Sequence, residues 1–208
     1  MSAACNHTDD LPTEQPGFRR ALWWVIAINA GMFVVEGLAG WQSGSLALLS
    51  DSLDFAADAA TYGISLAVLG ASLSVRSWAA IAKGASMGVL GAWILVMAGL
   101  AAISGDVPDA PTMSVVGFLA LVANLVSVLF LLRFRNGDAN LRSVWLCSRN
   151  DAIGNVAVML AGAGVFASAS RWPDLAVATI MATLFISGAI SILRQARHEL
   201  RDGHSSHA

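Results

Sequence analysis

Charged residues are scarce in this 208-residue sequence: Asp, Glu, Lys and Arg together make up only 12% of it. A typical soluble domain carries about 25%, so the scarcity argues against a soluble enzyme and against a disordered protein. The net charge is −2, which provides no basic surface for a nucleic acid. The two cysteines, Cys5 and Cys147, are too few for a disulfide framework. We therefore expect neither a nucleic-acid partner nor a disulfide-stabilised scaffold.

Apolar residues are abundant instead, at 56% of the chain, and the mean hydropathy is +0.66. A membrane-spanning helix needs about 20 mostly apolar residues. Several runs of about this length carry no charged residue, and two more are interrupted only by acidic residues. The sequence therefore predicts an all-α membrane protein whose six spans cover residues 20–41, 45–71, 80–103, 111–133, 143–168 and 173–194.

The distribution of basic residues predicts the orientation, because loops rich in Lys and Arg stay in the cytoplasm. Of the twelve Lys and Arg residues, all but Arg149 and Arg171 lie on one side of the predicted spans. We therefore expect both termini to be cytoplasmic, in a plasma membrane or a bacterial inner membrane. The predicted organisation is a polar N-terminal tail (1–18), a six-helix transmembrane domain (19–195) and a short C-terminal tail (196–208).

The second predicted span carries three acidic residues, Asp51, Asp54 and Asp58. Ionisable residues inside a span are costly, so they usually face the protein interior and mark a pathway. At about 100° per residue, Asp54 and Asp58 lie one turn apart on one face, with Asp51 near both. Three like charges on a dry face indicate that cations visit it or that protons neutralise it. For Asp51 an alternative stays open, namely an acid near a helix end that is exposed to water.

The fifth predicted span repeats this spacing with Cys147, Asp151 and Asn155. A thiolate and a carboxylate one turn apart are two metal ligands on one helix face. With Asp54 and Asp58 they would form a four-ligand site that suits Zn²⁺, and the sulfur argues against Mg²⁺, Ca²⁺ and Mn²⁺. A lone buried cysteine is more often a small hydrophobic residue, so the spacing to Asp151 is what favours a ligand.

Polar residues also occur in the first span, where Asn29 and Glu36 share one face. They fit either a cavity wall or proton site, or a hydrogen bond between helices, which is a common use of Asn in membranes. Arg149 lies about 160° around the fifth helix from Asp151, so we do not expect it to reach the same ion. It pairs with Glu36 or reaches lipid headgroups, and the sequence does not decide between them.

Histidine is absent from all six predicted spans, and the four His residues lie in the tails. Intramembrane zinc or di-iron enzymes need His ligands on their spans, so the absence disfavours an enzyme. Tail residues could gather metal at the entrance, although disorder is the simpler interpretation of both tails. These residues are Cys5, His7, Asp9 and Asp10 at one end and His198, His204 and His207 at the other.

Two segments resemble motifs of the cation diffusion facilitator family, the proton-coupled exporters of divalent transition metals. Residues 44–58 are similar to the family's second-helix pattern, in which a His or Asp is followed four residues later by an Asp. Residues 147–155 are similar to its fifth-helix pattern of His, three residues, Asp and then Asn. Together with Asn29, Glu36 and the six-span layout, the resemblance extends over about residues 20–195.

The resemblance implies a metal site between the second and fifth spans, with Asp54, Asp58 and Asp151 as ligands. It also implies alternating access and exchange of metal for protons. Cys147 stands where the family usually has His, which leaves the fourth ligand and the metal preference open. We expect Zn²⁺ as transported substrate, with Cd²⁺ or Co²⁺ as alternatives, and no cofactor. The expected supporting or proton-pathway residues are Asn29, Glu36, Asp51 and Asn155.

We expect the chain to lack the family's cytoplasmic C-terminal domain, which dimerises and senses metal. A homodimer through the membrane helices therefore stays open. Two other functions remain as alternatives: an intramembrane metal-dependent enzyme that uses a bound water, and a proton-coupled exporter of organic cations with Glu36 as its essential acid. A purely structural role would leave the buried acidic residues unexplained.

Overall fold

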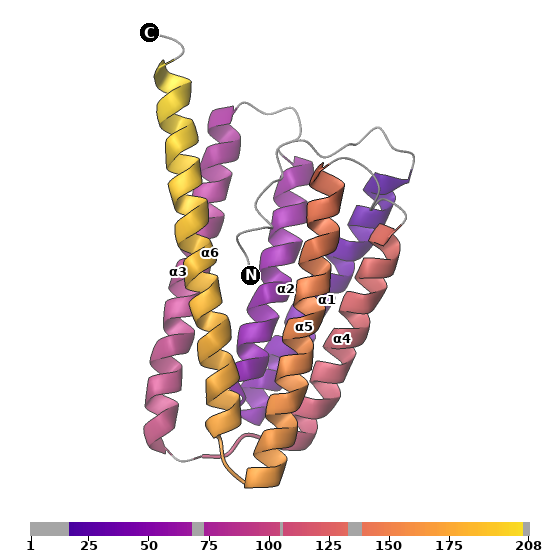
Figure 1. Ribbon diagram of the computed structural model, residues 1–208, viewed down its shortest axis with the longest axis vertical. Helices are drawn as coiled ribbons and strands as arrows, with labels where there is room; N and C mark the ends of the chain where they lie inside the picture. The colour runs from indigo at the N-terminus through magenta and orange to yellow at the C-terminus, as the bar shows by residue number, and fades with distance from the viewer. Residues whose placement is uncertain (1–16, 68–72, 105, 133–138, 206–208) are drawn as a thin grey trace.

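The computed structural model describes residues 17–67, 73–104, 106–132 and 139–205 (Figure 1). Within these ranges the chain forms six helices and no strand. The helices are α1 (Phe18–Ser43), α2 (Leu46–Ala67), α3 (Leu73–Ser104), α4 (Ala110–Leu132), α5 (Ala139–Ser168) and α6 (Trp172–Ser205). The all-helical prediction with six long segments is confirmed.

Two helix boundaries differ clearly from the predicted spans. Helix α3 begins at Leu73 rather than at residue 80, and α6 continues through Ser205 rather than ending at residue 194. Hydropathy marks only the part of a helix that suits a bilayer. The backbone hydrogen bonds continue past that part for as long as helix formers follow, and the segment after residue 194 is rich in them.

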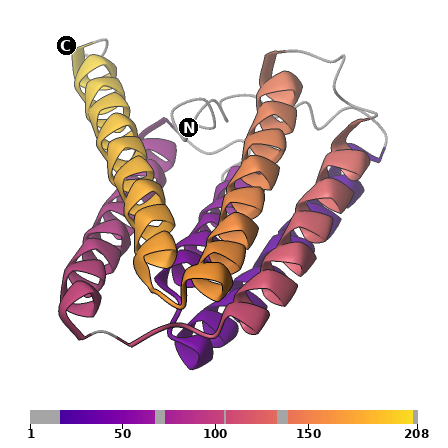
Figure 2. The ribbon, with the colours of Figure 1, turned by 60° about the horizontal axis from the view of Figure 1, so that its bottom comes forward.

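The helices form two groups that are close at one end of the bundle and diverge at the other (Figures 1 and 2). Helices α3 and α6 pack along each other, and α1, α2, α4 and α5 form the second group. Helix α2 contacts every other helix, so it is the central element. The N-terminal end of α1 and the C-terminal end of α6 lie at the diverging end, as an even number of antiparallel passes requires (Figure 1).

Glycine residues let these helices approach closely. A Cβ atom on Gly91 of α3 would lie 3.2 Å from the backbone oxygen of Ala182 in α6. A Cβ on Gly162 of α5 would lie 2.9 Å from Oγ of Ser114 in α4. Since lipid tails are as apolar as the side chains, close van der Waals packing of this kind holds membrane helices together.

The outer surface is apolar, which is the reverse of a soluble protein. Trp41, Phe166 and Ile103 are 74%, 78% and 86% exposed. Counting only described residues, five helices are long and apolar enough to cross a membrane, and the remaining one, α2, carries the three aspartates. This surface and these lengths identify a multi-pass membrane protein.

At the start of α6, the side chains of Asp174 and of the preceding Arg171 bind the ends of α2 and α3. Asp174, which is fully buried, accepts hydrogen bonds from Ser45 Oγ (2.6 Å) and from the backbone N–H groups of Leu46 (3.0 Å) and Ala47 (3.1 Å). These N–H groups belong to the first turn of α2 and have no partner inside the helix. Ser45 also caps α2 by accepting from the N–H of Leu48 (3.1 Å).

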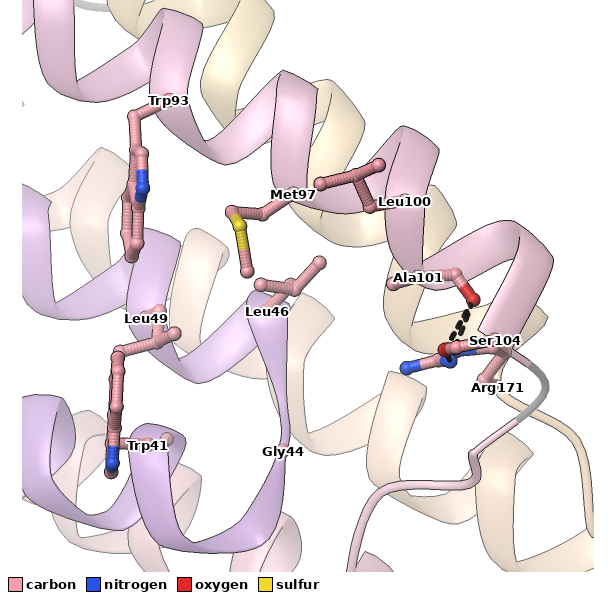
Figure 3. A pocket seen from close by; sticks show the side chains of 11 residues that line it. Trp41, Gly44, Leu46, Leu49, Trp93, Met97, Leu100, Ala101, Ser104 and Arg171 are labelled. Carbon is pink, nitrogen blue, oxygen red and sulfur yellow. Dashed lines mark hydrogen bonds between the residues drawn. The ribbon is translucent and has the colours of Figure 1, made fainter.

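Arg171 makes the matching contact with α3. Its Nη1 donates to the backbone oxygen of Ala101 and to Oγ of Ser104, both at 2.6 Å (Figure 3). Beside it lies a pocket of about 330 Å³ between α1, α2 and α3, whose lining is mostly apolar (Figure 3). We call the group Ser45, Ala101, Ser104, Arg171 and Asp174 the closed end.

Candidate metal site

The acidic residues of α2 and α5 meet at mid-depth of the bundle. The carboxyl group of Asp151 on α5 is close enough to interact with those of Asp54 and Asp58 on α2. All three side chains are partly buried, and Asp151 Oδ2 has no hydrogen-bond partner among the residues that the structure describes. The four-residue spacing in α2 places Asp54 and Asp58 on one face, and α5 lies against that face.

The fourth predicted ligand, Cys147, lies in the part of α5 whose side chains are outside the described residues. The same holds for Arg149, so the choice between Glu36 and lipid as its partner stays open. Among the described side chains alone, no group of three His, Cys, Asp or Glu residues is already arranged to hold a metal ion. The ligand set of Asp54, Asp58, Cys147 and Asp151 therefore stays a prediction, although three of its members are neighbours.

A second pair of acids lies closer to the closed end. Glu36 of α1 and Asp51 of α2 are 0% and 1% exposed, and their carboxyl groups interact. Both oxygens of Glu36 and Oδ2 of Asp51 lack a hydrogen-bond partner among the described residues. The alternative that Asp51 is exposed to water near a helix end is therefore wrong. The start of α2 is covered by α6, because Asp174 binds its first turn.

Two buried asparagines complete this interior. Asn29 donates from Nδ2 to the backbone oxygen of Val25 (2.8 Å), so this bond lies inside α1 rather than between helices. Asn155 is fully buried, and both atoms of its amide lack a partner in the described part of the chain. It lies one turn beyond Asp151 towards the closed end. An amide without partners can rotate to donate or accept, as a transient ligand requires.

Sequence reasoning missed Lys83, which was counted only among the basic residues that set the orientation. Lys83 is partly buried on α3, and its Nζ donates to Oγ1 of Thr61 on α2. Its charge acts on the carboxylates of Asp58 and Asp54. Its position inside the predicted span 80–103 was the available signal, since a Lys there needs a polar partner.

Asp174 and Arg171 were also missed as buried residues. Arg171 follows Ser170 and Asp174 follows Pro173, a context that is typical of an exposed helix start. Along α2, the polar groups follow one another from the diverging end to the closed end. Their order is Lys83 with Thr61, then Asp58 and Asp54 with Asp151, then Asp51 with Glu36, and finally Ser45 with Asp174.

The family model of the cation efflux transmembrane domain matches residues 22–201 of the chain. The sequence is also similar to the magnetosome protein MamB of Magnetospirillum gryphiswaldense, with 26% identity over 206 aligned residues. This alignment covers 87% of the chain and 66% of MamB, so the chain spans about two-thirds of the length of that relative.

Proposed function

Because the chain belongs to the cation efflux, or cation diffusion facilitator, family, we propose that it exports a divalent transition-metal ion across the membrane in exchange for protons. Zn²⁺ is the first candidate substrate, and Cd²⁺ and Co²⁺ are the other two. The family match over residues 22–201 supports transport. The donor set supports the choice of metal, since carboxylates with a thiolate suit Zn²⁺ better than they suit Mg²⁺ or Ca²⁺.

One observation carries this proposal: Asp151 lies beside Asp54 and Asp58, and one of its buried carboxylate oxygens has no hydrogen-bond partner in the described part of the chain. Several like charges in a partly buried place repel one another and lose hydration. A structural site would satisfy these oxygens with N–H or O–H donors. A divalent ion coordinated by Asp54, Asp58, Asp151 and Cys147 would compensate both costs at once.

Proton exchange follows from the chemistry of these ligands. Carboxylates and thiolates bind metal only after losing their protons, so metal and protons compete for the same groups. Three carboxylates and a thiolate carry up to four negative charges, so the empty site holds protons that belong to the coupled group as a whole. We assign Glu36 and Asp51, the next acids towards the closed end, to the proton pathway.

Alternating access requires that the two groups of helices move relative to each other. In this conformation they diverge at one end and are joined at the other (Figure 2). The hydrogen bonds of Asp174 join α6 to the first turn of α2, and thus one group to the other, at the closed end. We propose that these bonds rearrange when the site opens to the opposite side.

The test is metal flux into proteoliposomes under a pH gradient, with Zn²⁺, Cd²⁺ and Co²⁺ supplied in turn. We expect uptake of metal coupled to proton movement for the wild type, loss of both with Asp54→Asn, and an altered order of metals with Cys147→Ser. Asp106→Asn, in the exposed loop before α4, is the control and should transport normally.

Metal binding should also weaken at least about tenfold per pH unit below neutral, because binding one ion displaces one or more protons. An affinity that does not change between mildly acidic and neutral pH would contradict proton exchange. Unchanged metal flux in Asp54→Asn, together with loss of organic-cation export in Glu36→Gln, would favour the organic-cation alternative instead.

A further inference from the structure

Lys83 is the only Lys of the chain, and its surroundings are unusual for a Lys near a membrane surface. A Lys at such a position normally extends its ammonium group to water or to lipid headgroups. Here the side chain is partly buried, and Nζ donates to Oγ1 of Thr61 on the neighbouring helix α2. Thr61 is itself buried and donates to the backbone oxygen of Ala57 (2.6 Å).

The position of Thr61 brings this ammonium group to the carboxylates. Thr61 follows Asp58 by three residues, so both lie on the same face of α2. The charge of Lys83 acts on Asp58 first and on Asp54 second. Lys83 therefore places its ammonium group near two of the predicted ligands, on the side of the site that faces the diverging end.

We propose that Lys83 is the built-in counter-cation of the empty site and that it competes with the transported metal ion for the α2 carboxylates. This inference rests on the proposed function. A divalent ion bound by Asp54 and Asp58 would repel the ammonium group and remove the negative charge that attracts it. When the ion leaves, Lys83 again compensates the carboxylates, which disfavours rebinding and favours turnover.

Lys83 also links the occupancy of the site to helix movement. It lies on α3, whereas its partners lie on α2, and these helices belong to the two groups that diverge (Figure 1). Binding of the metal would release this contact between the groups. Lys83 acts here as a positioning residue, since it affects the ion through the carboxylates and is not itself a ligand.

The experiment measures Zn²⁺ affinity by calorimetry on the purified full-length protein and Zn²⁺ turnover in proteoliposomes. Lys83→Gln removes the charge but keeps a hydrogen-bond donor for Thr61. We expect its Kd for Zn²⁺ to fall about tenfold, within the usual range for coupled sites, and its turnover at saturating Zn²⁺ to fall as well. Lys83→Arg keeps the charge and should restore both values towards wild type.

Arg194→Gln is the matched control. Arg194 is exposed on α6, next to the level at which Gly84 of α3 meets Ile192 and Leu193. The substitution Arg194→Gln removes one positive charge at the level of Lys83 but from a different helix face. We expect it to change neither the Kd for Zn²⁺ nor the turnover. If Lys83→Gln does not fold, Thr61→Val removes the acceptor of Nζ, together with the bond of that hydroxyl to Ala57, but keeps the Lys83 charge, and we expect a smaller tightening of Zn²⁺ binding.

Two results would overturn the inference. An unchanged Kd in Lys83→Gln would mean that the charge does not reach the site. A weaker Kd would mean that Lys83 prepares the carboxylates for metal rather than competing with it. A wild-type protein that neither binds nor transports Zn²⁺, Cd²⁺ or Co²⁺ would overturn the proposed function itself. The failure of the inference is therefore seen in the variants, and the failure of the proposed function is seen in the wild type.

Discussion

The closed end and the predicted metal site of α2 and α5 both contain buried acidic groups, but the hydrogen bonding of these groups differs. At the closed end, Asp174 accepts three hydrogen bonds, and both of its oxygens are used. Asp151 at the predicted site, and Asp51 and Glu36 next to it, each keep at least one buried oxygen without a hydrogen-bond partner within the described ranges. A satisfied buried carboxylate stabilises a fold, whereas an unsatisfied one costs free energy. This is the difference that we expect between a structural polar group and the proposed metal ligands.

The largest effect should come from Asp151→Asn, which removes one of the unsatisfied carboxylates. We expect metal flux to fall to background, because the predicted site loses a ligand. The free energy of unfolding should stay equal or rise, because repulsion with Asp54 and Asp58 is relieved. Flux in proteoliposomes and thermal unfolding in detergent measure the two quantities. A variant that transports normally but is destabilised would place Asp151 with the structural groups.

Asp174→Ala tests the other side of the comparison. It leaves Ser45 Oγ and two N–H groups of α2 without their acceptor, so we expect a loss of about 2–4 kcal/mol in the free energy of unfolding. Equilibrium unfolding in mixed micelles measures it, and Asp106→Asn serves as the control. If stability is unchanged and only transport is lost, the closed end is part of the transport chemistry rather than of the fold.

Ser104→Ala should have a smaller effect at the same end. Arg171 Nη1 loses one of its two acceptors but keeps the backbone oxygen of Ala101. We expect a loss of about 0.5–1 kcal/mol in the free energy of unfolding, measured in the same micelles. A loss as large as that of Asp174→Ala would show that the contact with α3 matters as much as the contact with α2.

The smallest effect concerns Asp109, an exposed and satisfied carboxylate just before α4. The backbone N–H (3.0 Å) and the hydroxyl of Thr112 donate to it, and these bonds hold the pKa of Asp109 below its ordinary value. Its contribution to stability is therefore present above the ordinary pKa of about 3.9 and is lost as the pH falls through the lower folded value. Asp109→Ala should lower Tm slightly at neutral pH, and the difference from wild type should disappear in acid. A difference that persists in acid would contradict this capping role.

The sequence predicted the helices and the polar face on each of α2 and α5 because both follow from short-range patterns. Apolar runs locate the helices, and the four-residue spacing of Asp54 and Asp58, and of Cys147 and Asp151, defines one face on each of two helices. The roles of Asp174 and Lys83 depend on long-range contacts. Asp174 meets α2 over a separation of 127 to 129 residues, and no local pattern marks that pairing.

The hydrogen bonds of Asp174 also fix the rotational phase of α2. They hold the first turn of a continuous rod that carries Asp51, Asp54 and Asp58 farther along. One residue inserted between Ala47 and Asp51 would turn everything beyond it by about 100°. The first turn of α2 would stay bound to Asp174, while Asp51, Asp54 and Asp58 would rotate away from α5. The rotation of α2 that brings its acidic residues next to Asp151 of α5 is thus set several residues away, outside the proposed metal site.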